Sequence, residues 1–106
     1  MPKYLVKVSY TLDGLKGLIA KGGSARVEAA THAIESQGGS VESFYFALGE
    51  HDVYVVTDAP DNVAISAVVL AINAAGGAVC QTVVLLTPEE VDQAAQKTVD
   101  YSPPGS

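Results

Sequence analysis

The chain has 106 residues, a length typical of one domain, and 48% of them are hydrophobic, which argues against a disordered polypeptide. Its formal net charge is −6, with only six Lys and Arg residues. Binding to phosphate backbones depends on clusters of basic residues, so we expect neither nucleic acid nor an anionic membrane surface as a partner.

Only 17% of residues are charged, below the usual share of about 25%. This deficit predicts that another subunit covers part of the surface. The single cysteine, Cys80, excludes an internal disulfide. The first residues lead directly into a strand pattern, and no apolar run approaches the roughly 20 residues that span a bilayer. We therefore expect a cytoplasmic protein.

Residues 4–10 alternate in the manner of a β-strand. Tyr4, Val6, Val8 and Tyr10 fall on one face, which we expect to be core. The other face is mixed and holds Leu5, Lys7 and Ser9.

Residues 11–21 have helical spacing, but Gly14 and Gly17 weaken it, so we expect one or two short turns. After a Gly-Gly pair, Ser24 is the expected N-cap of a helix over about 25–37. Its inward stripe is predicted to be Val27, Ala30, Thr31 and Ile34, and its outward residues Arg26, Glu28, Glu35 and Gln37.

Residues 41–59 form the central stretch, which predicts two strands joined by a tight reversal at 49–52. This hairpin contains both Phe residues, two of the five Tyr residues and His51. If the chain has a site, we expect it on or beside this hairpin.

Pro60 and Asp61 are expected to start the next helix, with Asp58 as a possible cap. Residues 63–75 are apolar on nearly every side, which is typical of a helix buried on more than one face. A last strand is predicted over 79–86.

Thr87, Pro88 and Glu90 form a strong helix start, with a capping box, and this helix is expected to reach about residue 98. Val91, Ala94 and Ala95 are expected to face inward. Residues 100–106 are predicted to be a flexible tail, which leaves 1–99 as a single domain.

The two halves of the chain share a segment. Residues 33–41 resemble residues 71–79, and each copy combines a helix end, a Gly-Gly pair and the start of a strand. The resulting order is strand, helix, strand, strand, helix, strand and a terminal helix. This order predicts an α+β, ferredoxin-like fold (βαββαβ plus a C-terminal helix), with both main helices on one face of a four-stranded antiparallel sheet.

The opposite sheet face would then be bare. Alternation predicts that it holds Leu5, Lys7, Ser9, Val41, Ser43, Tyr45 and Ala47, with Tyr54 and Gln81 as further candidates. Such a mixed face fits a homo-oligomer that assembles through the sheet and encloses a cavity for a small organic ligand. The cavity candidates are Lys7, Ser9, Tyr45 and Tyr54, with Tyr10 beside them. The alternative is a packed interface with no cavity.

Several segments, in the same order, resemble the GYD domain, a small bacterial family. They cover 4–11, 16–18, 22–26, 38–39, 42–50 with Asp52, 59–61 and 86–91. The resemblance implies a ferredoxin-like fold that assembles through its sheet, and it implies no catalytic residues. His51 stands where the family usually has Tyr in its Gly-x-Tyr-Asp turn.

Candidate chemistry is sparse. His51 beside Asp52 could act as a general base, although a structural turn is the simpler interpretation. His32 is expected on a solvated helix surface, and Cys80 as a small core group. No residue spacing indicates a metal site, and we expect no cofactor.

The composition and pattern therefore favour a non-catalytic homo-oligomeric domain that binds a small organic ligand in an intersubunit or sheet-face cavity. One alternative is a cofactor-independent enzyme similar to the dimeric ferredoxin-like monooxygenases, with His51, Asp52 or Tyr45 as acid, base or orienting group. A further alternative is a purely structural assembly or interaction module.

Overall fold

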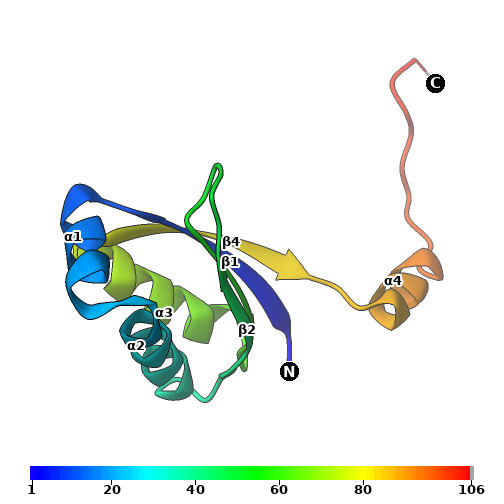
Figure 1. Cartoon of the computed structure of the whole chain (residues 1–106). Helices are drawn as coiled ribbons and strands as arrows, with labels where there is room; N and C mark the ends of the chain where they lie inside the picture. Colours follow the sequence, from blue (N-terminus) through cyan, green and yellow to red (C-terminus); the bar gives the residue numbers. More distant parts are fainter. Residues whose placement is uncertain (106) are drawn as a thin grey trace.

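The computed structural model describes residues 1–105. Its elements follow one another as β1 (Lys3–Tyr10), α1 (Leu12–Lys21), α2 (Gly23–Glu35), β2 (Ser40–Phe46), β3 (Val53–Asp58), α3 (Asn62–Ala74), β4 (Ala78–Leu85) and α4 (Pro88–Ala95). The strands form one antiparallel sheet in the order β2-β3-β1-β4. Helices α2 and α3 lie on one face of that sheet (Figure 1). The predicted α+β, ferredoxin-like fold is confirmed.

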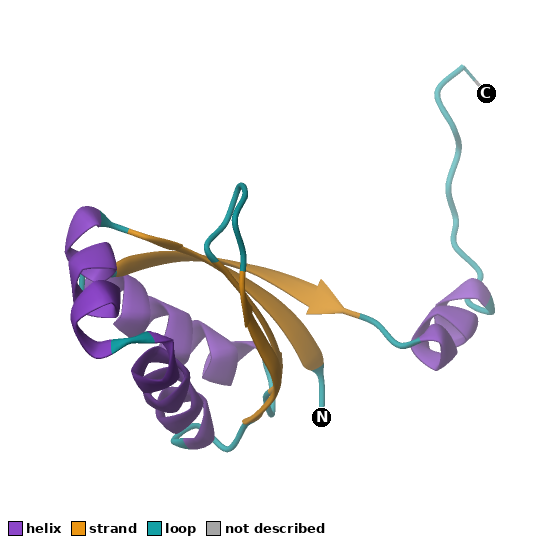
Figure 2. Ribbon diagram, in the orientation of Figure 1, coloured by secondary structure: helices purple, strands orange, loops and turns teal. Residues whose placement is uncertain are grey.

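The core lies between the sheet and helices α2 and α3. The predicted inward residues Tyr4 and Val6 of β1 are buried there, together with Ile34 of α2 and Ile65 of α3. The alternation of β1 and β3 sends every second side chain toward these helices. Figure 2 shows the opposite sheet face without a covering helix.

Helix α1 is longer than the sequence predicts, at ten residues. Thr11 caps it by accepting a hydrogen bond from the backbone N–H of Gly14. Gly14 weakens the helix but allows a close approach, because a Cβ at this position would collide with the carbonyl oxygen of Gly77. Tertiary packing therefore explains a glycine that helix propensity alone counts as unfavourable.

Helix α2 begins earlier than predicted. Gly22, at φ +84°, is both the end of α1 and the N-cap of α2, and Ser24 lies inside the first turn. The prediction of Ser24 as N-cap is therefore wrong. Arg26 was also expected to point outward, but it is half-buried and lines a hollow with Tyr10.

Helix α3 is capped by Asp61, whose carboxylate accepts the N–H of Ala64 at 2.8 Å. Asp58, the cap considered from the sequence, instead pairs with Lys3 at 2.9 Å. The internal repeat is confirmed in the backbone: Gly38 and Gly76 follow the ends of α2 and α3 with φ of 80° and 84°. These are the left-handed helix ends for which glycine is favoured.

A bulge in β2 changes the predicted register. Val41 lies opposite Thr57 and Ser43 opposite Val56, so Glu42 is the extra residue. Val41 consequently packs against the core, and its predicted place on the open face is wrong. The hairpin connection is also longer than the expected tight reversal. It runs from Ala47 to Asp52 and is closed by a 2.8 Å bond from the N–H of the first to the carbonyl of the second.

Helix α4 has the predicted capping box but not the predicted packing. Thr87 and Glu90 exchange both capping hydrogen bonds, and Pro88 is the first helical residue. The helix ends at Ala95, and Val91, Ala94 and Ala95 are all exposed, so their predicted inward orientation is wrong. Figure 1 shows α4 and the C-terminal segment projecting away from the rest of the molecule. The predicted tail is described as far as residue 105, and its last position lies outside the described residues.

Candidate functional site

The open face of the sheet carries one polar row that crosses all four strands. Tyr45 of β2 lies opposite Tyr54 of β3, Tyr54 opposite Lys7 of β1, and Lys7 opposite Gln81 of β4. Directly paired side chains on one face are close enough to contact the same bound group. The pairing therefore brings together three of the four predicted ligand residues, and it places Gln81 with them.

An apolar row runs beside the polar row. Val56 of β3 lies opposite Leu5 of β1, which in turn lies opposite Val83 of β4. Leu5 and Val56 are half-buried, and Val83 is 39% exposed. A sheet face with an apolar row next to hydroxyl, amide and ammonium groups can contact a molecule with both apolar and polar parts.

The fourth predicted ligand residue, Ser9, contacts the hairpin connection. His51 Nδ1 lies 3.1 Å from Ser9 Oγ, and the imidazole meets the Tyr54 ring edge-on with centroids 6.0 Å apart. His51 is only 8% exposed. The connection rises from the sheet on the side away from the helices (Figure 1). It therefore forms a wall along one side of the polar row, because Ser9 lies on the side of Lys7 opposite to Leu5 and the apolar row.

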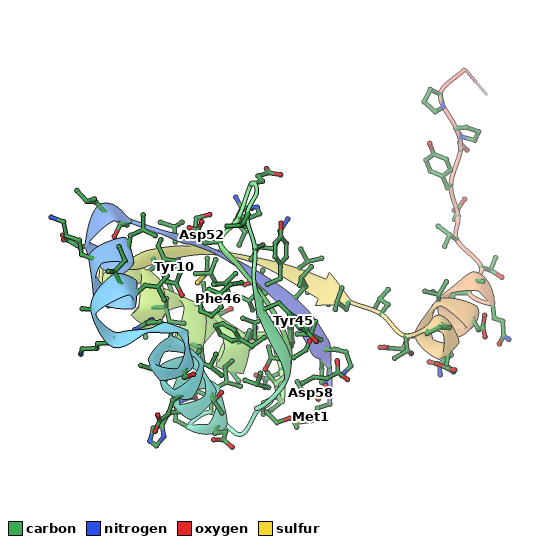
Figure 3. All side chains as sticks on the ribbon, viewed as in Figure 1. Met1, Tyr10, Tyr45, Phe46, Asp52 and Asp58 are labelled. Carbon is green, nitrogen blue, oxygen red and sulfur yellow. The ribbon has the colours of Figure 1, made fainter. Side chains whose placement is uncertain are left out.

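Asp52 faces β1 rather than the open face. Its carboxylate accepts the N–H of Tyr10 at 2.8 Å, and its own N–H donates to the carbonyl of Val8 at 2.8 Å. Figure 3 shows Asp52 beside Tyr10. Both hydrogen bonds hold the end of the connection against β1, just beyond the last β1–β3 pair, Val8 and Val53. Asp52 is thus a structural residue that fixes the connection, and the His51 imidazole is paired with Ser9 instead of this carboxylate.

The two lysines of β1 differ in their partners. Lys3 bonds Asp58 at 2.9 Å and Glu42 at 3.2 Å, and these hydrogen bonds raise its pKa above 10.5. Lys7 forms no ion pair within residues 1–105. It therefore supplies the polar row with a positive charge that no carboxylate of the described chain neutralises.

Tyr10 does not belong to the open face. It belongs to the core-facing set of β1 and lines a hollow of about 520 Å³ with Arg26, Lys21 and the Gly76–Gly77 end of α3. Phe46 contributes to a neighbouring hollow with Leu48, while Tyr45, the residue before it in β2, is 70% exposed on the other side of the strand (Figure 3). The sequence grouped Tyr10 with the cavity residues, and alternation along β1 separates them.

His32 and Cys80, the remaining candidates, lie outside the polar row. His32 is exposed on α2. Cys80 faces the core, and burial raises the pKa of its thiol, which disfavours the reactive thiolate. Among residues 1–105, no group of His, Cys, Asp and Glu side chains is arranged to hold a metal ion. No helix in the same range is long and apolar enough to cross a membrane.

The contact between His51 and Ser9 was missed at the sequence level, although a signal for it exists. Once Val8 is paired with Val53, the chain just before Val53 must lie beside Ser9. The register of β3 against β1 can be deduced only if the length of the β2–β3 connection is known. The sequence predicts a connection shorter than the observed one, which runs from Ala47 to Asp52.

The sheet order and the single layer of helices define a ferredoxin-like α+β domain with an uncovered sheet face. The model of the GYD domain family matches residues 4–95, and the chain belongs to this family. No curated protein and no solved structure matches the chain in the corresponding searches.

Proposed function

We propose that this protein is a self-associating binding domain. A second copy covers the open sheet face, and a small organic ligand is held between the two sheets. The observation that carries the proposal is the single row formed by Tyr45, Tyr54 and Lys7 in the strand pairing. It supports a ligand with an acidic or hydroxyl oxygen that contacts this row.

The apolar row indicates the rest of the ligand. Leu5, Val56 and Val83 offer contact area to an aromatic or aliphatic body but no hydrogen bonds. Lys7 and the two tyrosine hydroxyls provide charge and hydrogen bonds at one side of it. We therefore infer an apolar organic molecule with an anionic or phenolic group.

Association through the sheet is tested by Val83→Glu. Val83 is 39% exposed in the apolar row, and a carboxylate there would lose its hydration between two sheets. We expect the native mass to fall from that of an oligomer to that of a single chain. Ile19→Glu is the matched control, because it adds the same charge at an 84% exposed position on α1. Equal masses for wild type and Val83→Glu would refute pairing through this face.

The ligand is tested with 1-anilinonaphthalene-8-sulfonate, a fluorescent probe with an apolar body and an anionic group. Lys7→Gln should weaken its binding about tenfold or more, since a hydrogen bond to a charged group contributes about 1.5–3 kcal/mol. Lys16→Gln, which removes an exposed charge on α1, should leave the affinity unchanged. The same affinity in both variants would refute the role of the polar row.

One contact favours a second candidate, a cofactor-independent oxygenase acting on an aromatic or polyketide-like substrate. His51 is held by Ser9 at 3.1 Å beside the Tyr54 ring, where it could move a proton of a substrate on the row. Asp52 is directed away from the row, toward the backbone of Tyr10, and is not assigned this role. Oxygen uptake with an anthrone, abolished by His51→Gln but retained in Lys16→Gln, would support this enzyme. Absence of uptake in the wild type would remove it.

A further inference from the structure

The C-terminal arm, residues 86–105, contains a helix that no other described part of the chain covers. Every residue of the arm is exposed. No other element within residues 1–105 packs substantially against α4. Helices shorter than about 12–15 residues are marginal in water by themselves, and α4 has eight residues. The capping box helps to start the helix, but an outside surface is needed to keep it formed.

The arm has a narrow apolar side suited to close packing. Val91, Ala94 and Ala95 recur at helical spacing, and Leu86 precedes the cap at the position that packs on the first turn. Val91 is 51% exposed and Leu86 is 60% exposed. Alanines on this side would allow another helix to approach closely.

A complementary surface lies on α3. This helix, Asn62–Ala74, contains no charged residue, yet Val63 and Leu70 are 78% and 68% exposed. An uncharged helix with large apolar side chains in water is unusual for a surface helix. Beside it, Leu70, Val69 and Val84 line a groove of about 500 Å³ between α3 and β4.

The charges of the two surfaces are compatible. The first turn of α4 carries Glu89 and Glu90, followed by Asp92. Among residues 1–105, no charged side chain lines the groove, whose polar members are Tyr4, Asn62, Ser66 and Thr82. The acidic side of α4 can therefore face water while its apolar side meets α3 without like-charge repulsion.

The hinge directs the arm away from its own groove. Thr87 is extended, at φ −73° and ψ 159°, and the following Pro88 disfavours a helical conformation at this residue. The arm consequently continues outward from β4, as Figure 1 shows. A chain held in this direction reaches a neighbour more readily than the α3 surface behind it.

We propose that two copies of this chain exchange arms, so that α4 of each copy docks in the α3–β4 groove of the other. Exchange of an identical element is a common route to dimers, and it gives both unpartnered apolar surfaces one reciprocal contact. Arm exchange requires a second copy, as the proposed function does, but it uses a different surface of the chain. Ligand binding reports on the sheet face, whereas protection of the arm reports on the exchange.

The test is a complementation experiment read by hydrogen exchange and mass spectrometry of the full-length chain. Leu70→Glu blocks the groove, and Val91→Glu blocks the arm. Each variant alone should lose amide protection in the arm, with exchange about tenfold faster or more. Gln93→Glu, on the side of α4 opposite to Val91, is the matched control and should keep wild-type protection.

The two blocked variants are then co-expressed. A mixed dimer contains one intact arm, on the Leu70→Glu chain, and one intact groove, on the Val91→Glu chain. The arm peptides differ in mass at position 91, so each chain is read separately. With random pairing, about half of the Leu70→Glu chains should regain a protected arm.

Two results would overturn arm exchange. The first is an unprotected arm in the wild-type oligomer. The second is an arm on the Leu70→Glu chain that stays unprotected in the co-expressed sample, because docking within one chain cannot be restored by a partner. If the wild-type oligomer did not bind the fluorescent probe, but the co-expressed variants regained arm protection as expected, only the ligand proposal would be contradicted.

Discussion

The two faces of the sheet are built from the same four strands but follow different rules. On the helix-covered face, Tyr4 is 1% exposed and donates its hydroxyl to Asn62 at 2.6 Å, and Val53 is fully buried. On the open face, Tyr45 is 70% exposed and shares a row with Lys7. The chain's own helices cover one face. Within residues 1–105, no helix covers the side chains of the other face, which remain available to a partner.

The largest expected effect is a difference in the free energy of unfolding between two Tyr→Ala substitutions, one on each face of the sheet. Tyr4→Ala removes a buried ring and leaves Asn62 without its partner, so it should lower the free energy of unfolding by about 3–5 kcal/mol. Tyr45→Ala should change it by less than about 0.5 kcal/mol in the dissociated chain. Urea denaturation at low protein concentration measures both values. Similar losses would contradict the assignment of Tyr45 to an open face.

A smaller effect concerns the residue that joins the hairpin connection to β1. Asp52→Ala leaves the Tyr10 N–H without an acceptor and should cost about 1–3 kcal/mol. Hydrogen exchange at the Tyr10 amide should become faster, and the contact between His51 and Ser9 should loosen. Glu50→Ala, at an exposed position in the same connection, is the control and should have little effect. A normal Tyr10 amide in Asp52→Ala would exclude this structural role.

The smallest effect lies at the charged edge of the open face. Asp58 first, and then Glu42, raise the pKa of Lys3 above 10.5 through hydrogen bonds. Because the pKa is higher in the folded state, the pairing stabilises the fold below pH 10.5, and this contribution disappears as the pH rises through the folded-state value. The small stability difference between wild type and Lys3→Met should therefore vanish in alkaline solution. A stability difference between wild type and Lys3→Met that increased with pH would contradict this role of the Lys3 pairing.

The sequence predicted the parts of the fold that depend on local patterns. Alternation in β1, the repeated helix-Gly-Gly-strand unit and the Thr87–Glu90 capping box each depend on residues close together in the chain, and the structure confirms all three. Alternation also separated Lys7 and Ser9 from the core residues of β1. Most of the candidate site could be predicted for this reason.

The errors occurred where distant segments compete. The choice between Asp58 and Asp61 as helix cap depended on Lys3, which is far away in the sequence and engages Asp58. A single bulge at Glu42 transferred Val41 to the other face, because side chains in a strand alternate with a period of two. Residue type alone does not reveal such an insertion.

The sequence by itself determined which residues form strands and helices, since periodicity and capping act over a few residues. Only the tertiary structure decided that Tyr45, Tyr54 and Lys7 share one row, because register between strands is set by pairing across the sheet. It also decided that α4 leaves the body of the molecule, because an amphipathic helix specifies that one side needs cover but not which surface provides it.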